Sequence, residues 1–245
     1  MLGSSTGKVN DTIKSHLSII ILTKNSMLKY IRTLEKICGN YAPSRIISFN
    51  MVHVFKTLQL IKRRGHVSRD LLWKELGLGE GAIRTLIRHL QMNNMIIATN
   101  AGTTMTQEGE ALLSELLSSI PAEMSLPKCS LALGKFNYVV LLKQHSHSIK
   151  LGIEQRDAAI KIGAKGATTL LFKDTKFMMP SNNTSYDSLQ NEPYISKLLT
   201  RTLNPEEGDA IIIGSDDTHK KRSEHAAKNA ALLTIRNHEK HNDHF

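Results

Sequence analysis

The sequence predicts an α+β fold in two parts, a helical N-terminal half and a C-terminal half that mixes strands with helices. Two patterns support this. Apolar residues recur at steps of three and four through residues 27–120, as on one face of a helix. From Phe136 onward they gather in short unbroken runs, such as FNYVVLL and TTLLF, which are typical of buried strands. Pro121 and Pro127 mark the boundary, and we expect residues 122–134 to form a linker.

Length and composition suit a globular protein. The 245 residues are 40% hydrophobic and 22% charged, which is enough to build a buried core. The best candidate for a signal or membrane segment, LSIIIL at residues 17–22, is short and precedes no cleavage site, so we expect a cytoplasmic protein. Cys38 and Cys129 lie far apart without CxxC spacing, which favours free thiols over a disulfide or a zinc site.

The chain opens with a segment that lacks a regular pattern. Residues 1–26 begin with Gly, Ser, Thr and Asn, and we expect a poorly ordered N-terminal extension there. Because helical spacing begins just after it, Met27 is an alternative to Met1 as the true start. Apolar residues then step at helical spacing as far as Ile37, and the Gly39-Asn40 pair ends this helix.

The next elements follow one another closely. In order, the pattern predicts a helix through Val52–Ile61 that ends at Lys62-Arg63-Arg64-Gly65, a helix from Ser68, a turn at Gly77-Leu78-Gly79, a helix from Glu80 to Met92, strands at Met95–Ala98 and Thr103–Met105, and a helix from Thr106 through Ile120. This order is the layout of a winged helix-turn-helix, so the fold class becomes α+β, an N-terminal winged helix-turn-helix domain at 27–121 followed by a small C-terminal α/β domain.

Residues 135–236 make up the expected α/β domain. Its strands are expected at Phe136–Leu142, Thr168–Phe172, Phe177–Met179 and Asp209–Ile213, with Ser148–Ile153 pairing with the first; its helices are expected at Arg156–Ile162, Ile195–Leu203 and Arg222–Ile235. Residues 237–245 are polar, and we expect a disordered tail. The domain as a whole is expected to bind an effector or to mediate dimerisation.

The Glu80–Met92 helix carries the chemistry of the N-terminal domain. Its apolar face would dock on the other helices, which leaves the opposite face to Gly81, Arg84, Thr85, Arg88 and Gln91. Arg84 and Arg88 are one turn apart, so both can point into a major groove, where arginine pairs with guanine or clamps a phosphate. The alternative is an ordinary solvated helix face.

Two further groups are candidate contacts to the sugar-phosphate backbone. On the hairpin these are Thr99, Asn100, Thr103 and Thr104. The basic run Lys62, Arg63 and Arg64 either contacts phosphates or only complements the dipole at the end of its helix. The net charge of +10 favours an acidic partner, but its excess lies in residues 1–66, at +9, whereas residues 67–125 carry −3. A solubilising surface is the alternative explanation of this charge.

Two stretches of the C-terminal half could hold a small anionic ligand. Glu154, Arg156, Asp157 and Lys165 lie beside glycine-containing turns, and Ser215 and Asp216 follow a buried strand. The alternatives are a helix start and an ordinary turn. His145 and His147 are more typical of an exposed turn than of a metal site, and no catalytic motif is evident. We therefore expect no cofactor, no metal and no enzymatic activity.

Two long stretches of the sequence resemble known proteins. HVFKTLQLIKRRGHVSRDLLWKELGLGEGAIRTLIRHLQMNNMI, followed by TTMTQEGEALL, resembles the N-terminal DNA-binding domain of the central glycolytic genes regulator. With YAPSR before it and GIEQRDAAIKIGAKGATTLLF after it, the chain is similar to an uncharacterised archaeal family that joins this winged helix to a C-terminal α/β domain. The resemblance covers Tyr30 to Ile235. It implies a regulator of transcription and offers no ligand or activity to carry over.

The favoured hypothesis is a DNA-binding transcriptional regulator that binds double-stranded DNA as a homodimer and senses a small anionic effector. Two alternatives remain open. A winged helix can also serve as a protein or RNA interaction module, and the acidic balance of residues 67–125 favours that possibility. The second alternative is a small nucleotide-binding or enzymatic α/β domain tethered to DNA.

Overall fold

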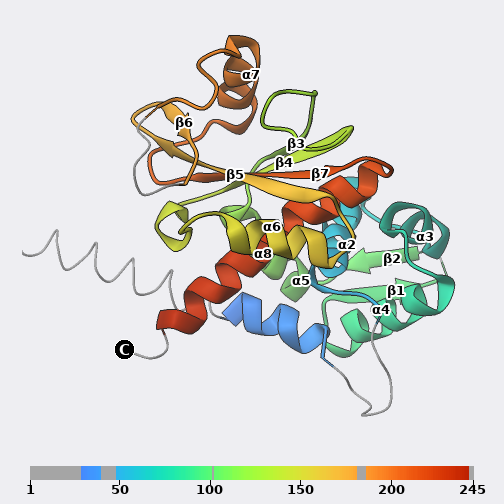
Figure 1. Cartoon of the computed structure of the whole chain (residues 1–245). Coiled ribbons are helices and arrows are strands. Elements are labelled where there is room, and N and C mark those ends of the chain that lie inside the picture. The colour runs from blue at the N-terminus through green and yellow to red at the C-terminus, as the bar shows by residue number, and fades with distance from the viewer. Residues whose placement is uncertain (1–28, 40–47, 101, 181–185, 243–245) are drawn as a thin grey trace, which may run out of the picture.

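The computed structural model describes residues 29–39, 48–100, 102–180 and 186–242. The expected N-terminal extension and both candidate start residues lie outside this part of the chain. Figure 1 shows a helical N-terminal domain packed against a C-terminal domain whose sheet carries helices on both faces. This arrangement confirms the α+β class.

The N-terminal domain has the element order expected from its sequence. A helix at residues 29–37 is followed by α2 (Met51–Arg64), α3 (Arg69–Leu76), α4 (Glu80–Met92), β1 (Ile96–Thr99), β2 (Gly102–Met105) and α5 (Gln107–Ser119). Strands β1 and β2 form an antiparallel hairpin in which Ile96 pairs with Met105. The hairpin therefore sits directly between α4 and α5 in the chain.

Short polar side chains fix where the helices of this domain begin. The Asn50 side chain accepts hydrogen bonds from the backbone amides of Val52 and His53 at the start of α2. Ser68 Oγ accepts from the Leu71 amide at 3.1 Å, as expected for an N-cap of α3. At the start of α5 a side chain on Gly109 would collide with the Met95 carbonyl oxygen, so only glycine lets this helix approach the hairpin so closely.

The C-terminal sheet is antiparallel throughout, in the order β3-β4-β7-β5-β6. Its strands are β3 (Glu123–Leu126), β4 (Phe136–Leu142), β5 (Gly166–Lys173), β6 (Lys176–Met178) and β7 (Ala210–Asp216). Its helices are η1 (Ser146–Ser148), α6 (Ile153–Lys161), α7 (Pro193–Leu203) and α8 (Lys220–Asn242). Antiparallel strands do not gather their carboxyl ends at one edge, so the ligand crevice of an open parallel sheet is not formed.

Three sequence expectations need correction here. Residues 122–134 are not a simple linker, because β3 lies within them and pairs with β4. Residues 148–153 do not pair as a strand, since Gly152 takes a left-handed conformation and starts α6 instead. The tail expected at 237–245 is helical as far as Asn242, because α8 meets no glycine or proline that would end it earlier.

Both faces of the sheet are covered (Figure 1). Helices α6 and α8 lie on one face and α7 lies on the other. On the α7 side, Val139, Ile211 and Leu199 belong to one buried cluster. On the other side, Val140 and Ile212 belong to a second cluster that continues into the N-terminal domain. The unbroken apolar runs of β4 and β7 follow from this burial on both faces.

The two domains share one hydrophobic core and are not separated by a linker. The cluster that holds Val140 and Ile212 also contains Leu34 and Phe55, and α8 packs against α2 as well as against β4 and β7. Within the described residues, none of the helices combines the length and the apolar character that crossing a membrane requires.

Candidate nucleic-acid interface

Helix α4 turns its apolar side inward and its polar side to solvent. The buried positions are Ile83, Leu86, Ile87 and Leu90. The exposed positions are Gly81, Arg84, Arg88 and Gln91, with Thr85 half-buried beside them. The Thr85 hydroxyl donates to the Gly81 carbonyl oxygen at 2.9 Å, so it turns back onto its own helix. Arg84 and Arg88 are therefore the side chains on this face best placed to contact a partner.

Arg84 and Arg88 differ in their surroundings. Arg84 Nη2 lies 2.5 Å from Glu80 Oε1, one turn earlier on the same helix. Both side chains are largely exposed, so this ion pair is readily exchanged for another partner. Arg88 makes no ion pair with any residue that the structure describes. A phosphate or a base edge would thus meet Arg88 directly and would compete with Glu80 for Arg84.

Helix α3 adds two residues that sequence reasoning did not select, Arg69 and Trp73. Together with Glu80, Ile83 and Arg84 they line a cavity of about 380 Å³ between α3 and α4. Trp73 is 51% exposed, although it is the only tryptophan of the chain. The sequence did contain a sign of this exposure, because Trp73 lies outside the apolar stripe that Leu72 and Leu76 form on α3. Both residues are exposed and border α4, so they extend its outer surface onto α3.

The hairpin presents only part of its expected contact set. Thr99, Asn100 and Thr104 are exposed. Thr103 is 3% exposed, and its backbone exchanges two hydrogen bonds with Val67 at 2.9 and 3.0 Å. This bridge adds the chain before α3 to the edge of the hairpin and turns Thr103 inward. Thr103 is therefore a structural residue, and its assignment to the interface was wrong.

The comparisons with known proteins bear on this surface. Residues 51–120 match the family model described as the CggR N-terminal DNA binding domain, and residues 133–235 match a domain of unknown function, DUF4443. We call these two regions the CggR-like domain and the DUF4443 domain, after the family models that they resemble. The resemblance inferred from the sequence is confirmed, since both halves match as expected.

A solved structure supports the same pairing of domains. A hypothetical protein from Pyrococcus horikoshii OT3 is 26% identical and superposes with a TM-score of 0.60, covering 79% of this chain and 95% of that chain. None of the curated proteins matches. The likeness thus extends across both domains and brings no activity with it.

The basic run at the end of α2 does not form one surface of the CggR-like domain. Lys62 Nζ lies 3.4 Å from Glu110 Oε1 on α5. Arg63 is on the stripe of α2 that carries Lys56, and its charge reaches Tyr138 of the DUF4443 domain. Burial raises the pKa of the Tyr138 hydroxyl above its usual range, and the Arg63 charge acts against that shift. Arg64 is exposed. The three side chains therefore point to different surroundings.

The ligand candidates of the DUF4443 domain are separated in space. Glu154 and Asp157 lie beside a cavity between α6 and α8. Arg156 Nη2 is 3.2 Å from Asp157 Oδ1, and Lys165 Nζ is 2.8 Å from Asp217 Oδ2. Arg156 and Lys165 are thus engaged in exposed ion pairs, and neither lines the cavity.

Ser215 and Asp216 are structural rather than ligand-facing. Both are buried in β7, because the strand runs three residues further than expected. Ser215 Oγ donates to Asn137 Oδ1 at 2.7 Å. Asp216 Oδ1 accepts from the amides of Thr218 and His219 ahead of α8. Burial alone would raise the pKa of Asp216, but these hydrogen bonds outweigh it and hold the pKa below its usual value.

His145 and His147 also differ from expectation. His145 is buried, not exposed, and its Nδ1 lies 2.5 Å from the Lys143 carbonyl oxygen. The two rings stack with their centroids 6.3 Å apart, so their nitrogens do not converge on one point. Cys38 and Cys129 are both free thiols, as expected.

The most strongly shifted pKa values lie at the junction of the two domains. Lys228, which is 1% exposed, donates to Gln59 Oε1 at 2.6 Å and to Glu224 Oε1 at 2.8 Å, and lies 3.0 Å from Glu123 Oε1. Burial would raise the pKa of Glu224, but the Lys228 and Lys56 charges lower it to about 2. This network is a packed joint between α2 and α8.

Proposed function

We propose that this protein is a cytoplasmic DNA-binding transcriptional regulator that reads duplex DNA with α4. One observation carries the proposal: Arg84 and Arg88 stand exposed one turn apart, opposite a helix face that is buried in a CggR-like domain. An α-helix fits the major groove, and arginine is the side chain best suited to guanine edges and phosphates there.

The surrounding surface supports the same docking. Arg69 begins α3, and Thr99 and Asn100 lie at the tip of the hairpin, so both flank α4 with groups that bond phosphate oxygens. Gly81 has open space around it, which lets the start of α4 approach a groove wall closely. In this proposal α4 reads bases, whereas α3 and the hairpin hold the duplex backbone.

The test begins with selection of genomic fragments that the full-length protein retains, followed by titration of a selected duplex. Arg88→Ala should weaken binding about tenfold and Arg84→Ala with Arg88→Ala should weaken it further, because each well-placed arginine contact contributes about 1–3 kcal/mol. Arg201→Ala, at an exposed position of α7 in the other domain, is the matched control. An unchanged affinity and salt dependence in the double variant would contradict this interface.

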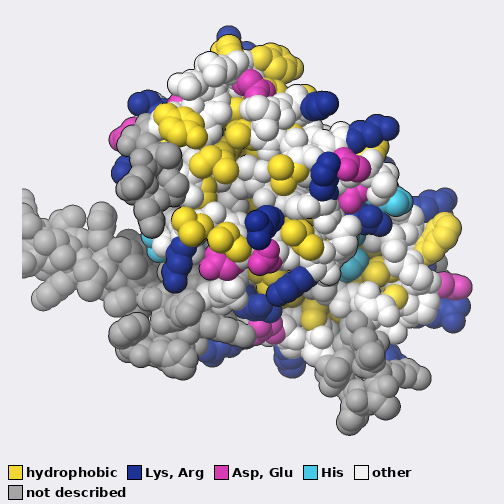
Figure 2. Space-filling view, viewed as in Figure 1, with side chains coloured by type: hydrophobic (Ala, Val, Ile, Leu, Met, Phe, Trp, Pro, Cys, Tyr) yellow, Lys and Arg dark blue, Asp and Glu magenta, His cyan; other side chains and the backbone are white. Residues whose placement is uncertain are grey.

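We further propose that the regulator is a homodimer through α6. Leu151, Ile153 and Ile160 are exposed apolar residues on or beside this helix. Figure 2 shows apolar side chains at the surface over α6. A twofold axis across the middle of α6 would place Arg156 against Asp157 of a second copy, so the face complements itself in charge. Sedimentation equilibrium of Ile153→Asp and Ile160→Asp should shift the protein toward monomer, and Tyr194→Asp on α7 should not. A dimer that survives both α6 substitutions would exclude this face.

We propose binding rather than catalysis as the task of the DUF4443 domain. The groups with the largest pKa shifts, including Glu224 and His225, are packed at the domain junction and not in an open cavity. Catalytic acids and bases must reach a substrate. Incubation with cell extract and mass spectrometry of the small molecules should show no consumed metabolite that depends on this protein; a protein-dependent product would contradict the proposal.

A further inference from the structure

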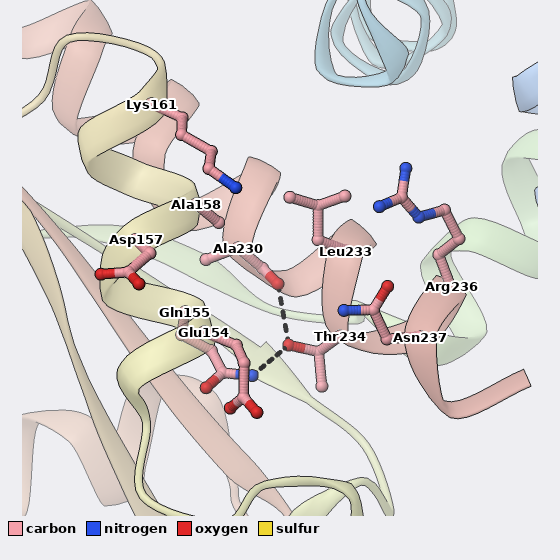
Figure 3. A pocket seen from close by; sticks show the side chains of 10 residues that line it. All are labelled: Glu154, Gln155, Asp157, Ala158, Lys161, Ala230, Leu233, Thr234, Arg236 and Asn237. Atoms are coloured by element: carbon pink, nitrogen blue, oxygen red, sulfur yellow. Dashed lines mark hydrogen bonds between the residues drawn. The ribbon is translucent and has the colours of Figure 1, made fainter. Parts of the chain in front are cut away.

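A cavity of about 200 Å³ lies between α6 and α8, away from the face of α4. Figure 3 shows the side chains that line it, with Lys161 and Glu154 from α6 and Arg236 and Asn237 from α8. Leu233 contributes apolar surface between them. A volume of this size fits a small metabolite rather than a nucleotide or a peptide.

Gln155 leaves a buried acceptor beside this cavity. The residue is 4% exposed, and its Nε2 donates to Thr234 Oγ1 at 2.7 Å. The Thr234 hydroxyl itself donates to the Ala230 carbonyl oxygen at 2.8 Å, so it can only accept from Gln155, and this fixes the orientation of the amide. Gln155 Oε1 then has no hydrogen-bond partner in the described structure. A buried acceptor of this kind gains from a ligand that donates.

Arg236 provides a buried hydrogen-bond donor that complements the Gln155 acceptor. Its Nε is buried and makes no hydrogen bond to the described residues. The carboxylate paired with it, Glu35 Oε1, lies 4.0 Å away, beyond hydrogen-bond distance. A ligand oxygen close to Nε would supply the missing acceptor. The cavity wall thus includes one buried donor and one buried acceptor without partners.

The charged groups of the wall are balanced in sign. Glu154 and Lys161 make no ion pair with any described residue, although they lie on the same side of α6. In the view of Figure 3 the cations of Lys161 and Arg236 lie toward one end and the Glu154 carboxylate lies toward the other. Glu154 and Lys161 are seven residues apart, which places their Cα atoms about 10 Å from each other along the helix. A simple anion would leave Glu154 facing it without compensation.

We propose that this cavity binds a small elongated zwitterion. Its ammonium group would donate to Glu154 and Gln155 Oε1, and its carboxylate would accept from Lys161 and Arg236. The two charged ends would be separated by a short aliphatic chain lying on Leu233 and Ala230. This refines the anionic effector expected from the sequence, because the cavity wall carries two carboxylates, Glu154 and Asp157, as well as two cations.

The cavity also has a path to α4, and this consequence rests on the proposed function. Arg236 pairs with Glu35 of the helix at residues 29–37, and the carbonyl oxygen of Ile37 in that helix lies 2.8 Å from His89 Nδ1 on α4. A ligand carboxylate would compete with Glu35 for Arg236. Occupancy of the cavity would therefore alter a helix that holds the inner face of α4.

Calorimetric titration of the full-length protein without DNA tests the site directly, so its result does not depend on DNA binding. The probes are ω-aminocarboxylates from glycine to 8-aminooctanoate, each compared with the amine and the carboxylate of equal length. Binding should be strongest for chains of about four to six carbons, in keeping with the helix rise. It should be weaker by about tenfold or more for probes that lack either charge.

Matched variants locate the binding. Glu154→Gln and Lys161→Met should each weaken the best probe about tenfold, because each removes one charged hydrogen-bond partner. Asp174→Asn is the control, since this exposed carboxylate lies in the turn between β5 and β6 and does not line the cavity. Retained folding is checked by thermal unfolding. Absence of binding by every probe, tighter binding of the plain carboxylates, or equal losses in Asp174→Asn and Glu154→Gln would overturn the proposal.

Discussion

Lys56 of α2 donates to the Glu224 carboxylate of α8 at 2.7 Å, across the joint between the CggR-like domain and the DUF4443 domain. The same carboxylate accepts from Lys228, so one acid holds two lysines that are almost fully buried. Removing the acid would take from buried Lys56 its ion-pair partner and would leave Lys228 with only Glu123 and Gln59. The joint is thus a place where one substitution acts on both domains.

Glu224→Gln should therefore destabilise the whole protein by about 3–5 kcal/mol, the usual cost of breaking a buried charged network. The readout is the midpoint of urea unfolding. Glu110→Gln, which breaks the exposed pair with Lys62, is the control and should shift stability by less than about 0.5 kcal/mol. Equal, small losses in both variants would show that the joint is not a stabilising element.

Stability should fall as the pH drops from about 6.5. Burial and the Lys56 charge together lower the pKa of His53 to about 4. Burial, followed by the charges of His53 and Lys56, lowers the pKa of His225 to about 3. Their rings stack edge to face with centroids 5.0 Å apart. Since both histidines take up protons more readily when unfolded, their contribution is complete above their ordinary pKa of 6.5 and is lost as pH falls toward the folded values.

Acid also acts on Glu224, whose folded pKa of about 2 lies below its ordinary 4.5, so its contribution disappears between those values. Urea midpoints measured from pH 8 to pH 4 should decline, and His225→Gln should flatten the upper part of that decline. His66→Gln, at an exposed position, should leave the profile unchanged. A wild-type midpoint that stays constant down to pH 5 would refute the histidine contribution.

Glu80→Gln should tighten DNA binding about two- to fivefold. The substitution frees Arg84 from its ion pair and removes a negative charge from the start of α4. Fluorescence anisotropy at two salt concentrations gives the measurement, and Asp174→Asn, at an exposed turn between β5 and β6, serves as a charge-matched control. A weaker affinity in Glu80→Gln would mean that this acid positions Arg84 for DNA rather than competing with it.

Gly81→Ala and Gly109→Ala should have opposite effects on stability. Gly81 has nothing within 4 Å of an added Cβ, so alanine should stabilise α4 by about 0.5–1 kcal/mol while weakening DNA affinity by crowding the groove. Gly109 meets the Met95 carbonyl oxygen and Met105, so alanine should cost about 1–3 kcal/mol. Thermal unfolding compares the two variants directly.

The helices of the CggR-like domain could be read from the sequence because they depend on local periodicity and caps. The buried side of α4 follows from the spacing of Ile83 and Leu90, and the start of α3 follows from Ser68. Thr103 could not be placed in this way, because its burial depends on Val67, far from it in sequence. The direction of a side chain in a short hairpin is decided by such long-range pairing.

The DUF4443 domain was harder to anticipate for a related reason. The apolar runs of β4 and β7 indicate strands that are buried on both faces. Such a run does not reveal whether the neighbouring strand is parallel or antiparallel, so the sheet topology could not be predicted. The cavity escaped notice because Gln155 and Thr234 are 79 positions apart in the chain. Only the first of the two patches selected from sequence, around Glu154 and Asp157, borders that cavity.

Helix α8 passes from the lysine-rich joint at Glu224 to the cavity at Arg236, a run of about 18 Å without a break. Because α8 is one continuous helix that packs against both domains, it provides no hinge between the CggR-like domain, proposed to read DNA, and the DUF4443 domain, proposed to bind a metabolite. The halves should then melt in a single transition, and a chain cut after Pro121 would expose the inner surface of α2 to water. Ligand binding in such a protein would be transmitted by small shifts of α8, which both domains share, rather than by rotation of one domain relative to the other.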